Sequence, residues 1–381
     1  MTGGSRALPI LSRFAGSIGA VALVASAVGA WFDRAAFFQG WLVAWLFVLS
    51  ISLAAMMNVM IHELTGGEWG LVLRAPLEAA MLALTFCALL AIPLAFGLPE
   101  LFAWARSDAM AVNDVRAQRW FSNVPSFLAR NAAWLAAWSA LALSFHRKIA
   151  ARGARELRAG RRIAVAGLAI YLVTITLFAY DWVVSLVPGW SSTAAGVRLG
   201  AGQFLAAFAF VVAFALSAPQ SRRAGSAVTP RDLQDFGNLL LTFAMFWAYI
   251  AYSEFLIVWA GDLPRETAWY APRLQSSWRW LALGVLALNF ALPFAAMLFR
   301  AVKCNRTALA GVCALVLFGQ WLDCVWLTAA SLRPRGFALH WLDFATLIAE
   351  GGLWLALVAA IIDRMPARGP VLRGQEAGAR G

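Results

Sequence analysis

The sequence is short of charged residues, and this scarcity excludes an ordinary soluble protein. Only 13% of the 381 residues are charged, whereas 62% are hydrophobic. A soluble domain carries about 25% charged residues. The composition therefore predicts a protein that lies largely within a lipid bilayer. Its 19 tryptophans fit that environment, because amphipathic rings favour the membrane–water interface.

Residues that bind redox cofactors are also few and scattered. The four cysteines form no C-x-x-C or C-x-x-C-H motif, which argues against an iron–sulfur cluster and against covalently attached haem. The histidines His62, His146 and His340 each fall at the end of a predicted helix, whereas a membrane haem b needs histidines that face each other within the bundle. One peripheral haem between His62 and His146 stays open as an alternative. We expect this chain to bind no metal and no cofactor, with quinol or quinone left open as a ligand.

A net charge of +12 would suggest a nucleic-acid partner for a soluble protein, but here the basic residues have another explanation. They lie mostly in the connections between apolar runs, where they fix topology and meet anionic lipid headgroups. Of the 31 lysines and arginines, 20 fall on the side that holds the N-terminus. The positive-inside rule then predicts cytoplasmic termini, and we expect the lipid bilayer, rather than nucleic acid, as the partner.

Ten apolar runs are long enough to cross a bilayer, which takes about 20 residues per helix. They predict an all-α integral membrane protein in which residues 1–364 form a single polytopic domain. Residues 365–381, rich in glycine and arginine, are expected to form a disordered tail. The predicted spans are 13–32, 40–61, 76–98, 127–146, 162–184, 192–217, 237–260, 277–299, 307–330 and 341–362.

The first span has a competing interpretation. Arg6, Arg13 and the small residues 25–27 also fit a cleavable signal peptide. The run stays uncharged up to Asp33, which favours a retained helix. Between the third and fourth spans, residues 99–126 mix aromatic and charged side chains, a pattern that predicts a helix lying in the membrane interface.

Inserting an ionisable side chain at the centre of a bilayer costs about 2.5–3.5 kcal/mol. The presence of such side chains within the predicted spans therefore needs an explanation. We interpret them as a proton path, in which neutral polar residues bridge carboxylates through water. The acidic and histidine candidates are His62, Glu78, Asp181, Glu254, Asp323 and Glu350, and the polar relay candidates are Tyr180, Tyr249, Tyr252, Asn289 and Gln320. Asp323 and Glu350 lie deepest, which favours a functional role for both.

The alternative is that these residues form hydrogen bonds and ion pairs between helices. Arg198 or Arg279, for example, would hold Asp181 or Glu254. Arg279 and Asp343 lie close to helix ends, which favours a structural role for them.

Several motifs that run in order along the chain resemble one known family. The first is residues 62–70 (HELTGGEWG) together with Glu78. The others are residues 178–186 (FAYDWVVSL), 190–193 (WSST) with Gly196, 235–240 (DFGNLL), 245–250 (MFWAYI) with Trp259, 290–294 (FALPF), 321–323 (WLD) and 340–343 (HWLD). Together they resemble ActF, a membrane subunit of alternative complex III within the NrfD/polysulfide-reductase-C-like family.

The resemblance implies ten helices, with helices 2–5 and 6–9 as two four-helix bundles and helices 1 and 10 at the periphery. It also implies a cofactor-free subunit of a quinol:cytochrome c oxidoreductase in a bacterial inner membrane, which is not catalytic alone. The implied partners are a second NrfD-like membrane subunit, an iron–sulfur protein and c-type cytochrome subunits, which carry the iron–sulfur clusters and haem c. Such a complex oxidises quinol and passes electrons towards cytochrome c or a terminal oxidase.

For the subunit itself, the resemblance implies a proton path. The positions that match it are His62, Glu78, Asp181 and Asp323. The chain departs from the family at Ile61, where a histidine is frequent, and at Asn289, where a histidine is expected before the FALPF motif. Because asparagine does not titrate as histidine does, the second departure weakens a proton-carrying role for the eighth span.

Two other functions fit the same composition. A secondary transporter also places ionisable groups near the membrane midplane but usually interrupts its helices there. The predicted spans look mostly continuous, with Pro293 as the only mid-span proline. A purely structural anchor for peripheral redox subunits would use the buried charges for packing.

Overall fold

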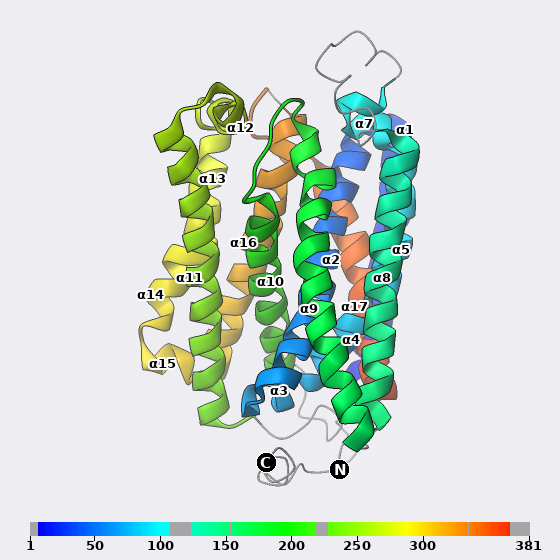
Figure 1. Ribbon diagram of the computed structural model, residues 1–381, viewed down its shortest axis with the longest axis vertical. Helices are drawn as coiled ribbons and strands as arrows, with labels where there is room; N and C mark the ends of the chain where they lie inside the picture. Colours follow the sequence, from blue (N-terminus) through cyan, green and yellow to red (C-terminus); the bar gives the residue numbers. More distant parts are fainter. Residues whose placement is uncertain (1–6, 107–122, 152–153, 218–227, 334, 366–381) are drawn as a thin grey trace.

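All regular structure in the described residues is helical, and no strand occurs among them. The structure is a computed structural model and describes residues 7–106, 123–151, 154–217, 228–333 and 335–365. In this part of the chain, nine helices are long and apolar enough to cross a membrane, and Figure 1 shows the long helices standing side by side. The predicted all-α membrane fold is confirmed.

The first half of the chain begins with α1 (Ala7–Phe32) and the long α2 (Arg34–Thr65), which the Asp33 side chain caps. Almost every residue of the apolar part of α2 is buried. The remaining elements of this half are α3 (Glu68–Val72), α4 (Arg74–Leu82), α5 (Leu84–Leu90), α6 (Ile92–Phe96), α7 (Leu98–Leu101), η2 (Ala103–Ala105), α8 (Val124–Ala151), α9 (Ala154–Trp182) and η5 (Val184–Leu186).

The second half begins with α10 (Ala195–Ser217), a second largely buried helix. Thr229 and Asp232 form a capping box that starts α11 (Pro230–Gly261). The remaining elements are α12 (Pro264–Leu274), α13 (Trp278–Leu286), the π-helical η6 (Ala287–Ala291), α14 (Leu292–Met297), α15 (Arg300–Lys303), α16 (Arg306–Leu332) and α17 (Trp341–Arg364).

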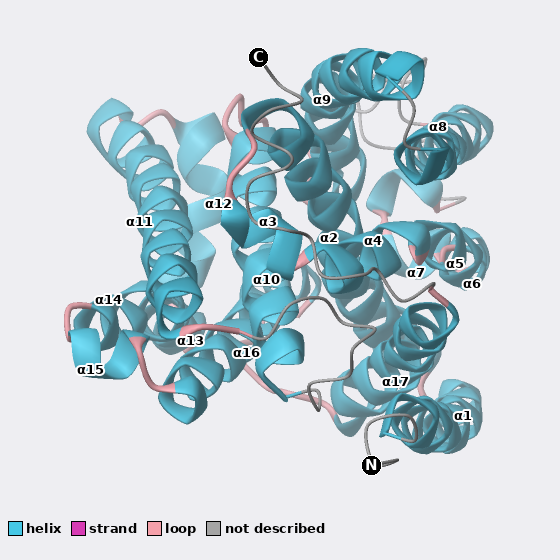
Figure 2. Ribbon diagram, turned by 90° about the horizontal axis from the view of Figure 1, so that it is seen from below, coloured by secondary structure: helices cyan, strands magenta, loops and turns pink. Residues whose placement is uncertain are grey.

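Two bundles of four spans meet along α2 and α10. The first consists of α2, the α4–α6 segment, α8 and α9, and the second of α10, α11, the α13–α14 segment and α16. Seen end-on in Figure 2, α2 and α10 lie next to each other at the centre. Because the protein encloses α2, its polar side chains face other helices rather than lipid.

α1 and α17 form an antiparallel pair beside the first bundle. Gly19 and Gly352 bring their backbones so close that a Cβ on Gly19 would lie 2.7 Å from the Leu353 nitrogen. Gly16 meets Ala356 further along, so α1 begins where α17 ends. We call this end of the molecule, at the bottom of Figure 1, the terminal end, and the other the far end. α17 also contacts α2 and α4, so it is less peripheral than expected.

Two spans are less regular than the sequence predicts. The third is interrupted at Ala83 and Ala91, which divide it into α4, α5 and α6. Pro93 lies in the first turn of α6, where its missing N–H removes one helical hydrogen bond. In the eighth span, a π-helical segment precedes Pro293. Each of these segments, Arg74–Phe96 and Trp278–Met297, is nevertheless long and apolar enough to cross a membrane as one helix.

The fourth predicted span, residues 127–146, forms α8 but is not among the nine most apolar helices. Its apolar residues are largely alanine, followed by leucine, and it contains Arg130. α8 nevertheless runs along α9 over most of the height of the molecule in Figure 1. Residues 107–122 of the predicted interfacial helix and residues 366–381 of the predicted tail lie outside the described residues.

Candidate functional site

Buried polar side chains form several separate groups. Four groups contain an arginine and a carboxylate: Arg198–Asp323, Arg130–Asp181, Arg74–Glu78 and Arg333–Asp343. Three of these pairs join residues from different segments of the chain, and Arg74–Glu78 lies within α4. Glu350 stands apart from all four.

The Arg198–Asp323 pair links α10 to α16 in the core of the second bundle. Arg198 Nη1 donates to Asp323 Oδ2 at 2.9 Å, and Arg198 Nη2 donates to Asp323 Oδ1 at 2.6 Å. Trp247 Nε1 donates a third hydrogen bond to Asp323 Oδ2 at 3.1 Å, while its ring lies 4.8 Å from the Arg198 guanidinium. Three hydrogen-bond donors and one positive charge therefore hold this single carboxylate in place.

A small void lies on each side of this pair. Each has room for about one water molecule. The first is lined by Val183, Trp190, Ala195, Arg198, Leu199, Glu254, Trp269 and Leu327, and the second by Phe47, Ser50, Leu199, Gly202, Gln203, Ala206, Gln320, Asp323, Cys324 and Leu327. Arg198 therefore borders one water-sized void, and Asp323 borders the other.

The second void continues into a hydrogen-bonded set of neutral side chains. Tyr171 donates its hydroxyl to Gln203 Oε1 at 2.9 Å, and Gln320 Nε2 donates to Asn289 Oδ1 at 3.0 Å. The π-helical segment η6 carries Asn289. Gly319 permits its approach, since a Cβ there would lie 2.7 Å from Asn289 Oδ1. Gln320 thus lines this void together with Asp323, and Asn289 is its hydrogen-bond partner.

Trp269 lines the first void and belongs to α12, which lies at the far end in Figure 1. Glu254 accepts a hydrogen bond from Ser192 Oγ at 2.7 Å. Burial, reinforced by the Glu254 carboxylate, raises the pKa of Tyr270 on α12. Arg273 donates to the Trp269 carbonyl oxygen at 2.7 Å and lies 3.7 Å from the Trp269 ring centre, and burial lowers its pKa to about 9.

Asp181 belongs to a separate group in the first bundle. Arg130 Nη2 donates to Asp181 Oδ1 at 2.7 Å, and Asn131 Nδ2 donates to Asp181 Oδ2 at 3.1 Å. Trp182 Nε1 in turn donates to Asn131 Oδ1 at 2.5 Å. This group resembles the Asp323 site in chemistry, because an arginine and a neutral donor hold one buried carboxylate in each.

His62 and Glu78 meet at the terminal end. Arg74 donates to Glu78 Oε1 at 2.5 Å and lies 3.4 Å from His62 Nδ1, while His146 Nδ1 lies 3.6 Å from Glu78 Oε2. Gly70 leaves room for the His62 ring, because a Cβ there would overlap it. Both histidines considered as haem ligands therefore belong to one ionic group.

Glu350 is completely buried in the middle of α17. Among the described residues, neither of its carboxyl oxygens has a hydrogen-bond partner. On the same face of α17, Trp354 Nε1 donates to Ser52 Oγ at 2.7 Å, and the Cys87 thiol lies 3.6 Å from that oxygen.

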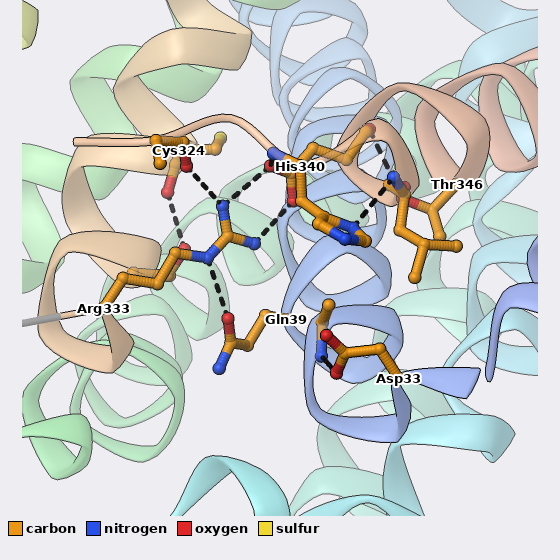
Figure 3. A network of polar contacts seen from close by, with 11 residues as sticks. Asp33, Gln39, Cys324, Arg333, His340 and Thr346 are labelled. Carbon is orange, nitrogen blue, oxygen red and sulfur yellow. Dashed lines mark hydrogen bonds and ion pairs between the residues drawn. The ribbon is translucent and has the colours of Figure 1, made fainter. Parts of the chain in front are cut away.

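Asp343 has a structural position at the start of α17 (Figure 3). Arg333 donates to both of its carboxylate oxygens at 2.7 Å and to Gln39 Oε1 at 2.8 Å. Asp343 and His340 together form a capping box. The network joins α2, α16 and α17 at the far end.

The structure corrects two expectations about these residues. Arg198 holds Asp323, and Arg130 holds Asp181, so the suggested pairing of Arg198 or Arg279 with Asp181 or Glu254 is wrong. Tyr249 and Tyr252 are 67% and 62% exposed on α11, which places them outside the buried network. Tyr180 is half-buried next to Asp181 in the chain.

Several residues of these groups were missed by sequence reasoning. They are Arg130, Asn131, Trp182, Tyr171, Gln203 and Trp247. Arg130 and Gln203 could have been recognised as site residues from the sequence, because each is a polar residue within an apolar run. Trp182 and Trp247 were noted only as members of motifs, because indole rings are common in all membrane helices and do not by themselves indicate a site.

Neither a metal centre nor a relative can be assigned from these features. Among the described residues, no three His, Cys, Asp or Glu side chains lie close enough to hold a metal ion. No protein-family model and no curated protein matches the chain. The functional argument therefore rests on the site and on the resemblance of the motifs.

Proposed function

We propose that this chain is a membrane subunit of a bacterial quinol-oxidising electron-transfer complex, in which it contributes a proton path. The observation that carries the proposal is the buried Arg198–Asp323 pair with a water-sized void on each side. Ionisable groups within a membrane mark ion or proton pathways in most proteins that have them. The order of the motifs along the chain supports an ActF-type subunit.

Protons would move beside the ion pair rather than through it. A water in the first void lies between Glu254 and Arg198, and a water in the second contacts Asp323, Gln203 and Gln320. Fixed charges on both sides orient such waters, and neutral amide and hydroxyl groups extend the chain. Glu254 gives this route a proton acceptor towards the far end.

The proposed partners supply the redox chemistry. Quinol oxidation needs haem or iron–sulfur groups, which we assign to c-type cytochrome and iron–sulfur subunits beside a second NrfD-like membrane subunit. In this arrangement the chain lies in the bacterial inner membrane with the terminal end facing the cytoplasm. The excess of lysine and arginine on that side supports the orientation.

Mild-detergent purification from the native membrane tests the assignment. Mass spectrometry of the co-purifying subunits is expected to find a multihaem cytochrome, an iron–sulfur protein and a second NrfD-like chain. A chain that purifies alone and moves a solute into vesicles would contradict the proposal. Unchanged proton coupling in both Asp181→Asn and Asp323→Asn complexes would contradict the proton path but leave the subunit assignment intact.

The π-helical interruption of the eighth span favours a secondary transporter as the second candidate function. The π-helical segment η6 presents Asn289 to Gln320 beside the second void, and transporter sites are often built at interrupted helices. Solute uptake by vesicles that contain only this chain distinguishes the two functions.

A further inference from the structure

Glu350 differs from the other buried carboxylates of the described spans in having no partner. Asp181, Asp323 and Glu78 each contact an arginine, and Glu254 accepts a hydrogen bond from Ser192. Glu350 is 0% exposed, and neither oxygen has a hydrogen-bond partner among the described residues. An ionised carboxylate in such a place is far less stable than a neutral acid.

The helices around Glu350 offer little that would stabilise a negative charge. α1 has no titratable side chain between Phe14 and Phe32, and α2 has none between Gln39 and Ile61. The α4–α5 segment presents the Cys87 thiol, which lies 3.6 Å from Ser52 Oγ, the hydrogen-bond acceptor of Trp354 on the Glu350 face of α17. The nearest arginine on that segment, Arg74, is already hydrogen-bonded to Glu78.

The surroundings of Glu350 contain hydroxyl and thiol groups that can pass a proton. Ser52 accepts hydrogen bonds from Trp354 and from Cys87, so the Ser52 hydroxyl hydrogen remains available to another acceptor. Trp354 lies on α17 itself, whereas Ser52 and Cys87 come from α2 and α5, which both contact α17. A neutral Glu350 thus has polar groups on one side of an otherwise apolar environment.

We propose that Glu350 is the proton-binding group of this subunit: it is held as a neutral carboxylic acid and gives up its proton during turnover. The proposal deepens the proposed function, because it assigns the change of protonation to one residue. Each cycle breaks the O–H bond of the acid, transfers the proton to a neighbouring hydroxyl or water, and restores the bond with a proton from the other side. No oxidant or reductant is consumed at this site.

Infrared spectroscopy of the full-length chain, with whatever subunits co-purify, tests whether Glu350 is a neutral carboxylic acid. The carbonyl stretch of a protonated carboxylic acid is separate from the bands of carboxylates. We expect one such band at neutral pH that disappears in Glu350→Gln, persists in Asp181→Asn and returns at a shifted position in Glu350→Asp. Equal spectra of the wild type and Glu350→Gln in this region would overturn the proposal, whether or not the chain belongs to a redox complex.

Proton transfer by the reconstituted complex tests whether Glu350 gives up its proton during turnover. Glu350→Gln preserves the shape and neutrality of the acid, so we expect native assembly and quinol oxidation with loss of coupled proton transfer. Coupling equal to that of the wild type would overturn the carrier role. A chain that co-purifies with no redox subunit would instead contradict the proposed function, while the infrared result would still decide the state of Glu350.

Discussion

Ser50 and Ser52 lie two residues apart on α2 but face different sites. Ser50 lines the void beside Asp323, whereas Ser52 accepts a hydrogen bond from Trp354 in the surroundings of Glu350. Two helical residues are separated by about 200° around the helix axis, so α2 divides the two sites. One site is charged and has space for water, and the other holds a single unpaired acid.

Replacing Asp323 with asparagine is expected to destabilise the protein strongly. The change leaves the Arg198 guanidinium buried without its counter-charge, and breaking a buried pair in this way costs about 3–5 kcal/mol. Thermal unfolding of the purified variant in detergent measures the effect.

A double variant separates stability from function at this pair. Arg198→Met with Asp323→Leu removes both charges, and apolar replacement of a complete pair is often neutral or stabilising. We expect unfolding at or above the wild-type temperature, together with loss of proton transfer. A double variant as unstable as Asp323→Asn would show that the pair contributes more than charge compensation.

The sequence predicted the positions of the helices better than it predicted which helices are neighbours. Apolar run length located the spans, and Asp323 and Glu350 within them are both buried. The partner of Asp323 was not predictable, because Arg198 lies 125 residues away in the chain and run length does not show which helix faces which. Asp181 and Arg130, 51 residues apart, were missed for the same reason, and the interruption of the third span was missed because it needs no proline at Ala83.

Valine in place of Gly19 is expected to separate α1 from α17. A Cβ at this position would lie 2.7 Å from the Leu353 nitrogen, and this backbone atom cannot rotate away. Overpacking of this kind costs about 1–3 kcal/mol, which a lower unfolding temperature would reveal. Gly16→Ala is the matched control, because its Cβ would make an ordinary contact of 3.4 Å with Ala356; equal loss in both variants would contradict the close approach at Gly19.

The stability of the far end is expected to fall at alkaline pH because of Tyr270. Burial raises its pKa in the folded protein, above the value of about 10 in an unfolded chain. The folded state therefore keeps a proton that the unfolded state loses, and the associated stability is complete below pH 10 and declines as pH rises further. Unfolding temperatures measured across this range should fall less steeply for Tyr270→Phe than for the wild type, and parallel curves would exclude Tyr270 as the cause.

Alanine in place of Gly202 tests whether the second void carries water. Gly202 lines this void, and an added Cβ would lie 2.9 Å from Gln320 Oε1 and 3.6 Å from Asp323 Oδ2. An added methyl group would occupy the room for about one water that this void offers, so we expect a folded complex with normal quinol oxidation and a several-fold slower proton transfer. Gly311→Ala on α16 is the matched control, since its Cβ would meet no atom within 4 Å. Equal proton transfer in the two variants would show that protons bypass the second void and would contradict its place in the proton path.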